Sequence, residues 1–273
     1  MTLKSMFGSR IMLIFDIHVH IYPDKIALKA SESIGIFYDG MPIQGNGSLS
    51  DCIQRMNDGG VARFASHSVA MSPHNVESIN HFILEAQAKY PDRVVPFAAI
   101  HPDMEDMQAA VDGIVARGFR GIKIHPDIQR FEVDGDRAAP MVEAIAGRLP
   151  LLIHCGDRRF DYDGPRRILR LHERFPGQPL ICAHFGGWSE WESAVELLAG
   201  HGLMVDTSSS LFAFPAEMAT KAVRSFGVEN VFYGTDYPMW TPKDELERFM
   251  RMELTDRERE DILGNNAARL FQL

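Results

Sequence analysis

The sequence predicts an α/β protein folded as a (β/α)8 TIM barrel, and three observations support this prediction. Short apolar segments alternate with longer amphipathic stretches, as parallel strands and their connecting helices do. Each apolar segment is bounded by Gly, Pro or polar residues, which is typical of strands buried on both faces. The residues that end successive later segments are spaced 29, 30, 22 and 30 residues apart, near the roughly 31 residues per unit of a barrel of about 250 residues; they are His125, His154, His184, Asp206 and Asp236.

The eight expected strands cover residues 11–17, 61–69, 94–100, 121–124, 151–154, 180–184, 203–206 and 231–235. A doubly wound parallel sheet is the alternative architecture. That fold usually carries a Gly-rich dinucleotide-binding turn after its first strand. Here the first strand runs into Asp16-Ile-His18-Val-His20 instead, which favours the barrel.

Helical patterns fill the gaps between the strands, and Gly or Pro marks their ends. We expect helices over 50–58, 73–90 and 103–117. Ser189-Glu-Trp-Glu192 and Thr255-Asp-Arg-Glu258 both read as capping boxes at helix starts. The long connection from Tyr22 to Gly60 contains several glycines, and we expect a mobile flap there, beside the site.

Composition limits the class of protein. Apolar residues make up 45% and charged residues 24% of the 273 residues, which excludes a disordered chain. Three cysteines are too few for a disulfide scaffold. The formal net charge of −9 argues against nucleic acid or an anionic membrane as a partner, since phosphates attract clustered Lys and Arg.

The domain organisation follows from the strand pattern. We expect an N-terminal extension over 1–11 and a single catalytic barrel domain over 12–273. No apolar run approaches the roughly 20 residues of a membrane span, and the run before Asp16 is too short for a signal peptide. We therefore expect a cytoplasmic protein. Homo-oligomers are common among such barrels, so assembly with further copies is kept open.

A His-Val-His motif at the end of the first strand is the sharpest local signal. Side chains two residues apart on a strand point to the same face, so His18 and His20 can converge on one ion. Such a pair alone is weak evidence. However, His154, His184 and Asp236 also end expected strands, and the carboxyl ends of barrel strands carry the catalytic groups of this architecture.

Three histidines and one carboxylate suit Zn²⁺, with Mn²⁺ or Fe²⁺ as other divalent candidates. We expect one ion per chain, which would lower the pKa of a bound water towards about 7. Asp236 could accept the proton of that water. His184 could polarise the substrate oxygen or donate a proton to the leaving group.

These motifs resemble the amidohydrolase superfamily. They are most similar to the amidohydrolase-related branch that includes aminocarboxymuconate-semialdehyde decarboxylase, resorcylate decarboxylases and pyrone-dicarboxylate lactonase. The resemblance rests on Asp16-Ile-His18-Val-His20, His154, Ala183-His184-Phe-Gly-Gly, Gly234-Thr-Asp236-Tyr-Pro and the closing Ile262-to-Phe271 segment. It implies that His18, His20, His154 and Asp236 bind the metal. It also implies that His184 is an acid/base group near the metal, although the matching His is itself a ligand in two-metal members.

Further residues are weaker candidates. Lys123 lies on the strand where some superfamily members carry a carboxylated bridging Lys; the alternative is a Lys paired with a carboxylate. His125 and Trp188 are expected to line the substrate pocket, and Arg158 could bind a substrate carboxylate in bidentate fashion. Asp16 either orients one of the two histidines or caps the strand end.

Three functions remain open at this point. The favoured one is metal-dependent hydrolysis of a C–O or C–N bond in a small carbonyl compound. The alternative is non-oxidative decarboxylation of an aromatic or muconate-like acid by the same centre. The third is a metal-stabilised binding protein without turnover, which the extra acid/base group His184 disfavours, because a structural metal site needs none.

Overall fold

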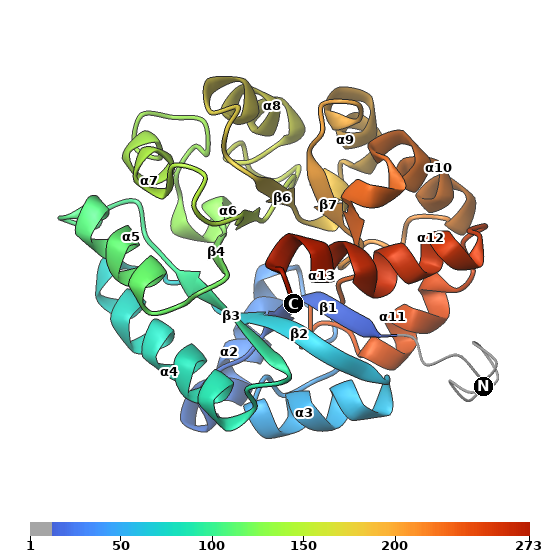
Figure 1. The fold of residues 1–273 in the computed structure, drawn as a ribbon, viewed down its shortest axis with the longest axis horizontal. Helices are drawn as coiled ribbons and strands as arrows, with labels where there is room; N and C mark the ends of the chain where they lie inside the picture. Colours follow the sequence, from blue (N-terminus) through green and yellow to red (C-terminus); the bar gives the residue numbers. More distant parts are fainter. Residues whose placement is uncertain (1–12) are drawn as a thin grey trace.

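Eight parallel strands form one sheet in the order β1 to β8 in the computed structural model (Figure 1), which describes residues 13–273. The strands are β1 Ile14–His20, β2 Val61–His67, β3 Val94–Ala99, β4 Gly121–Ile124, β5 Leu151–Ile153, β6 Leu180–Cys182, β7 Met204–Asp206 and β8 Val231–Phe232. The predicted (β/α)8 barrel is therefore confirmed, and the doubly wound alternative is wrong. The expected extension over 1–11 lies outside the described residues.

The segment that follows β8 closes the sheet onto β1. The backbone amide of Ile17 donates to the Tyr233 carbonyl at 3.0 Å, and the amide of His20 donates to the Tyr237 carbonyl at 2.7 Å. The amide of Asp236 donates in return to the His18 carbonyl at 2.9 Å. These bonds fix the end of β1 directly beside Asp236.

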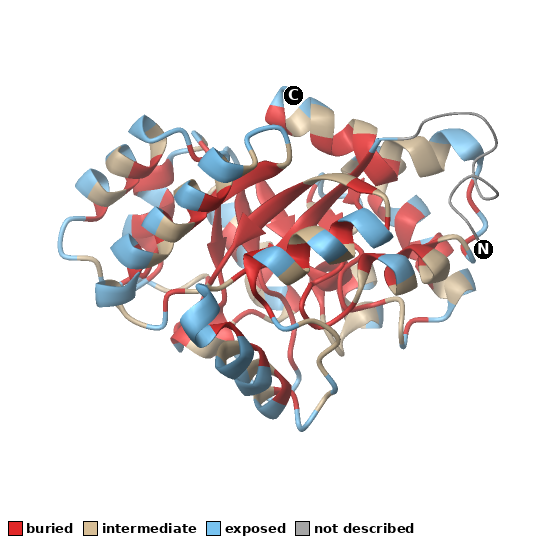
Figure 2. Cartoon of the chain, turned by 90° about the horizontal axis from the view of Figure 1, so that it is seen from below, coloured by how far each residue is buried: buried red, intermediate tan, exposed pale blue. Residues whose placement is uncertain are grey.

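Two apolar layers stabilise the barrel. Side chains inside it, including Phe15, Ile17 and Phe97, form a cluster that Phe271 of α13 (Asn266–Phe271) also joins. A larger cluster fills the space between the outside of the sheet and the helices. Figure 2 shows the strands largely buried and most helices exposed on their outer side only. The interior is therefore packed, and the end of the barrel away from α13 is left for function.

The surrounding helices are α2 Asp24–Phe37, α3 Leu49–Asp58, α4 Val76–Lys89, α5 Met107–Ala116, α6 Pro126–Gln129, α7 Ala139–Ile145, α8 Pro165–Arg174, α9 Trp191–Leu198, α10 Ala216–Phe226, α11 Pro242–Phe249, α12 Asp256–Glu260 and α13. A five-residue π-helical turn, Asp261–Asn265, precedes α13. Across residues 13–273, the helices are all too short or too polar to span a bilayer.

The connection between β1 and β2, where we expected a mobile flap beside the site, is largely helical and borders the cavity; its mobility stays a prediction. It contains α2 and α3, and its longest segment outside these helices is 38–48. The helix α2 was not predicted from the sequence for two reasons. Pro23 precedes it and provides no side-chain cap. Its apolar residues are not confined to one face, since Ile26 and Ile36 are more than half exposed. The helix covers the carboxyl end of the barrel.

The predicted caps differ in outcome. Thr255 and Glu258 form the expected reciprocal capping box. The capping box predicted from Ser189 is wrong, since α9 begins after Glu190 without a side-chain cap, and Ser189 has a left-handed φ of 62°. The chain turns sharply there, which places the Ser189 hydroxyl against the backbone amide of Arg158 at 3.2 Å.

Several strands end earlier than the apolar runs suggested. His154, His184 and Thr235 all lie beyond their strands. His184 has φ 62° and Asp236 has φ 64°, so the chain leaves the sheet abruptly at both positions. These turns direct polar side chains towards the barrel axis, and the shortening of the strands is thus a feature of the site.

A fully buried carboxyl on α11 gives a test of the fold by pH. Burial raises the pKa of Glu245 to about 8, against the pull of Arg248, whose guanidinium donates to it. A folded-state pKa above the unfolded value means that stability falls as the pH rises from about 4.5 to 8. In the wild type, the free energy of unfolding should fall by at most about 1.4 kcal/mol per pH unit over this range because of Glu245. We expect E245Q to remove this dependence, as measured by urea unfolding at several pH values. An identical slope in both proteins would contradict this.

Candidate active site

A cavity of about 360 Å³ lies between the carboxyl ends of the strands and α2. Its floor is polar and holds residues from β1, β4 and the segments after β5, β6 and β8. Its walls are mostly apolar and come largely from α2, including Ile34, Phe37 and the adjoining Tyr38. The floor contains the histidines and the aspartate that the sequence pointed to, namely His18, His20, His154, His184 and Asp236.

An irregularity in β1 brings both of its histidines into this cavity. The pairing of β1 with β2 shifts register between Asp16 and Val19. Ile17 therefore lies inside the barrel while His18 and His20 line the cavity. Simple alternation would have placed Asp16 with them. Instead, Asp16 caps the strand end, accepting the amides of His18 and Thr235 at 3.0 Å each, so the interpretation as an orienting carboxylate is wrong.

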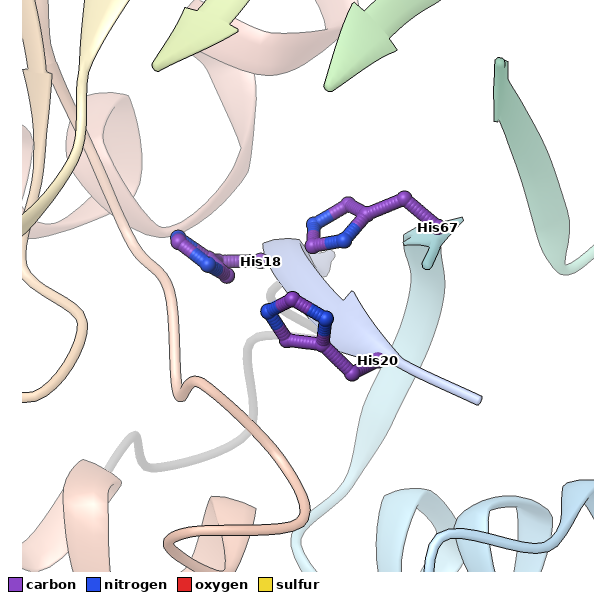
Figure 3. Close-up of side chains that lie close together, drawn as sticks. All are labelled: His18, His20 and His67. Carbon is purple, nitrogen blue, oxygen red and sulfur yellow. The ribbon is translucent and has the colours of Figure 1, made fainter. Parts of the chain in front are cut away.

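A third imidazole, that of His67 at the end of β2, completes a group of three histidines (Figure 3). The ring centroids of His20 and His67 are 4.4 Å apart, with the rings perpendicular. Neither nitrogen of His67 has a hydrogen-bond partner within residues 13–273, although the residue is fully buried. Burial holds the pKa of His67 well below its usual value. It is therefore a neutral base facing His18 and His20.

Asp236 lies within reach of both β1 histidines. Its Oδ1 is 3.4 Å from Nε2 of His18 and 3.4 Å from Nε2 of His20. Atoms about 2.1 Å from a tetrahedral cation are about 3.4 Å apart, so this spacing suits shared ligation better than a hydrogen bond of about 2.9 Å. The other oxygen, Oδ2, accepts the Ser209 hydroxyl at 2.6 Å, and Trp240 donates to that hydroxyl at 2.9 Å. The carboxylate is thereby held in place.

The histidines are oriented through their second ring nitrogens. His18 donates from Nδ1 to Oδ2 of Asp206 at 2.8 Å, which leaves Nε2 unprotonated and facing Asp236. His184 donates from Nδ1 to the Ser208 carbonyl at 2.9 Å. Its Nε2 lies 3.0 Å from Nδ1 of His154. Partners of this kind fix the tautomer of metal-binding histidines.

The electrostatics favour neutral imidazoles beside ionised carboxylates. Burial lowers the pKa of His18 to about 4 and also lowers the pKa of His20, His154 and His184. Burial acts in the opposite sense on Asp236, but His18 and the other nearby histidines hold the pKa of this carboxyl well below its usual range. Neutral imidazole and charged carboxylate are the forms that bind a cation.

A family model for amidohydrolases matches residues 15–273. The chain belongs to the amidohydrolase family. This agrees with the resemblance seen in its sequence motifs. No curated protein matches the sequence.

Solved structures share the fold of this amidohydrolase at low sequence identity. An uncharacterised TIM-barrel protein from Bordetella bronchiseptica matches with a TM-score of 0.77 and 19% identity, over 96% of this chain and 99% of its own. A 5-carboxyvanillate decarboxylase from Sphingomonas paucimobilis gives 0.73 and 15%, over 96% and 99%. A dihydroxybenzoic acid decarboxylase from Polaromonas, with bound manganese and 2-nitroresorcinol, gives 0.74 and 14%, over 96% and 97%.

The residues of this amidohydrolase fit a divalent cation. The floor offers unprotonated imidazole nitrogens and a carboxylate, which is the donor set of Zn²⁺, Mn²⁺ or Fe²⁺ sites. Ligand atoms of His18, His184 and Asp236 lie within 4.8 Å of one another, as do those of His18, His20 and His67. His154 also lines the cavity, but its Nδ1 lies 3.0 Å from Nε2 of His184 and its Nε2 points to Asp127 at 3.5 Å.

Lys123 of the amidohydrolase lies against the same floor. Its Nζ is 3.3 Å from Nε2 of His18, and the residue is 1% exposed. Burial lowers its pKa. Within residues 13–273 no carboxylate forms an ion pair with it, so the expected Lys–carboxylate pair is not found there. A bridging, carboxylated Lys123 stays a prediction.

The three predicted substrate-binding residues lie in different places. His125 lines the cavity, stacked on His154 with centroids 3.8 Å apart, and its Nε2 is 3.1 Å from the Tyr38 hydroxyl. Trp188 packs on Tyr38 behind the wall. Arg158 is exposed, donates to the Ser189 carbonyl at 2.9 Å, and lies outside the cavity lining.

Arg159, the next residue, contacts the wall instead. Its guanidinium lies over the rings of Phe37, Tyr38, Phe160 and Trp188, at 5.3 to 5.9 Å from their centroids. It also donates to both oxygens of Asp157 and to the Phe37 carbonyl. This cation joins the end of α2 to the loop after β5, a role that the sequence did not reveal.

Asp206 is the orienting residue that sequence reasoning missed. It ends β7, so the strand-end rule used for His154 and His184 could have found it. Its oxygens accept from Nδ1 of His18 and from the amide of His184. We expect Asp206→Asn to weaken divalent-cation binding by about 10- to 100-fold, measured by competition with a chelator. Unchanged affinity would contradict the orienting role; exposed Asp106→Asn serves as the control.

Proposed function

We propose that this chain is a metal-dependent decarboxylase acting on a small aromatic or muconate-like carboxylic acid, without an oxidant. One observation carries the proposal: an apolar cavity with aromatic walls ends on a floor of neutral histidines and one carboxylate. Apolar walls suit a flat ring, and the floor suits its ionised substituents. The product pair would be carbon dioxide and the ring with hydrogen in place of the carboxylate.

The proposed ligands are His18, His20 and Asp236; His154, which the family resemblance implies as a further ligand, is directed to His184 and Asp127 instead. When bound, the cation would act as a Lewis acid towards substrate oxygens. Manganese in the dihydroxybenzoic acid decarboxylase supports Mn²⁺ beside Zn²⁺. His184 is left as the group that moves a proton. Protonation of the ring carbon and cleavage of the bond to the carboxylate balance the reaction.

The walls would hold the ring and exclude water. Phe37 and Tyr38 present aromatic surface, and Ile34 and Met239 extend it. Lys29 of α2 is exposed at the cavity and has no carboxylate partner among residues 13–273. It offers a positive charge to an entering acid. The decarboxylases with the same fold act on acids of this class.

Hydrolysis is the second candidate, because the family is that of the amidohydrolases and a histidine–aspartate floor also suits activation of water. In that reaction Asp236 would accept the proton of the attacking water. The cavity favours the same compact, planar substrates, such as a lactone or a cyclic amide.

A substrate panel separates these functions. Full-length protein, freed of metal and reloaded with MnCl₂ or ZnCl₂, would be incubated with hydroxybenzoates, lactones and amides. We expect carbon dioxide release from a hydroxybenzoate with the loaded protein and none with the metal-free protein. Acid production from a lactone or amide, without carbon dioxide, would replace the proposal with hydrolysis. Metal binding without turnover of any compound would support a non-catalytic protein.

A further inference from the structure

A second cluster of ligating side chains lies beside the floor of the cavity. It consists of His125 and Asp127, next to and within α6, His154 after β5, and Asp163 before α8. Ligand atoms of all four residues lie within 4.8 Å of one another, and all four residues are buried. The three residues other than His154 have no part in the proposed decarboxylation centre. The cluster therefore needs its own explanation.

Most of the polar side-chain atoms in this cluster have no hydrogen-bond partner in the described part of the chain. These orphaned atoms are both carboxylate oxygens of Asp127, Oδ2 of Asp163, Nδ1 of His125 and Nε2 of His154. The exposures of Asp127 and Asp163 are 3% and 1%. Buried carboxylates without donors are strongly disfavoured. Three carboxylate oxygens and two imidazole nitrogens in this cluster lack a partner. We take this as an indication that a bound ligand satisfies them.

Among the described residues, no basic side chain fills this role. Arg159, whose charge acts on Asp127, directs its guanidinium to Asp157 and Asp39. Within residues 13–273 neither Asp127 nor Asp163 pairs with a Lys or Arg. Asp163 receives one donor, the amide of Gly156, on Oδ1 at 3.0 Å. Its other oxygen remains directed at the cluster.

We propose that His125, Asp127, His154 and Asp163 form a second site for a divalent transition-metal cation. Two carboxylates balance the charge of such a cation, and two imidazoles favour Zn²⁺ or Mn²⁺ over the all-oxygen ions Mg²⁺ and Ca²⁺. Four protein donors leave the site closed, as structural metal sites are. The cation would tie the segment after β4 to the loop after β5.

His154 stands between the two centres. Its Nδ1 faces His184 at 3.0 Å, and its Nε2 faces Asp127 at 3.5 Å. The second distance is too long for a hydrogen bond, so Nε2 is free to bind a cation. The second site does not depend on the proposed function, since Asp127, Asp163 and His125 would bind a cation whether or not the first centre is catalytic.

Counting bound metal tests this proposal. Metal-free full-length protein would be equilibrated with ZnCl₂, desalted and measured by elemental analysis. We expect two ions per chain in the wild type and one in Asp163→Asn, which keeps the size of the side chain. Exposed Asp161→Asn is the matched control and should keep two. The same number of ions in the wild type and in Asp163→Asn would overturn the proposal.

Anomalous scattering from wild-type crystals grown with ZnCl₂ gives a test that needs no variant. We expect one peak among the four side chains and a second beside His18. A water or an empty density at the cluster would overturn the second site even if the first peak is present. Conversely, a peak at the cluster alone would support the second site and contradict the proposed catalytic centre. Asp127→Asn replaces Asp163→Asn in the count if the latter does not fold.

Discussion

Replacing His18 with alanine should remove both the ion at the cavity floor and the activity. His18 offers Nε2 to the centre, and its Nδ1 is the partner of the buried Asp206. Alanine therefore deletes a ligand and leaves a buried carboxylate with one donor fewer. Because a bound metal contributes several kcal/mol of transition-state stabilisation, kcat/KM should fall by at least about 10³-fold.

The metal content should be measured in a protein that also carries Asp163→Asn. This change removes the proposed second site, so that the count reflects only the ion at the cavity floor. We expect the count to fall from one ion per chain to none. His81→Ala changes a histidine whose side chain is 70% exposed, and it should alter neither quantity. A stoichiometric ion in the His18→Ala protein would show that the centre is held by other residues.

Replacing His184 with glutamine should lower kcat by about 10²- to 10⁴-fold, the contribution of a positioned proton-transfer group, while the ion stays bound. Glutamine keeps a polar side chain of similar length beside Ser208 but cannot exchange a proton as imidazole does. KM should change little, because the apolar walls that hold the substrate are untouched. Steady-state kinetics and elemental analysis on the same preparation give the two readouts.

The metal content decides between two roles for His184. One of its ring nitrogens lies within 4.8 Å of ligand atoms of both His18 and Asp236, so ligation is the competing role. If His184→Gln loses the ion together with the activity, His184 is a ligand. Retained metal with retained kcat would remove His184 from the chemistry altogether.

The strand-end rule explains why the sequence located the floor of the cavity. Parallel strands of a barrel bring their carboxyl ends to one face, so residues as far apart as His18 and Asp236 could be placed together from apolar runs alone. The same rule applied to Met204–Asp206 would have added Asp206. No pattern of apolar residues marks the register shift in β1, which depends on pairing with β2.

The walls of the cavity were less predictable, because they depend on tertiary contacts. The helix α2 lacks a capping side chain and a single apolar face, since it packs on the barrel with one side and borders the cavity with another. Arg158 and Arg159 are indistinguishable in sequence, and only the turn at Ser189 and the rings around Arg159 separate them. Asp127 and Asp163 follow no strand directly, so their meeting could not be foreseen.

The helix α2 also has a consequence for how this chain could diversify. Residues that would perform chemistry come from the strands and the segments after them, whereas Ile34, Phe37 and their neighbours on α2 shape the space above. Substrate selectivity could therefore evolve, or be engineered, by exchanging residues on this one peripheral helix while the residues of the cavity floor stay unchanged. A library confined to the inner positions of Asp24–Phe37 is the economical starting point for new specificities.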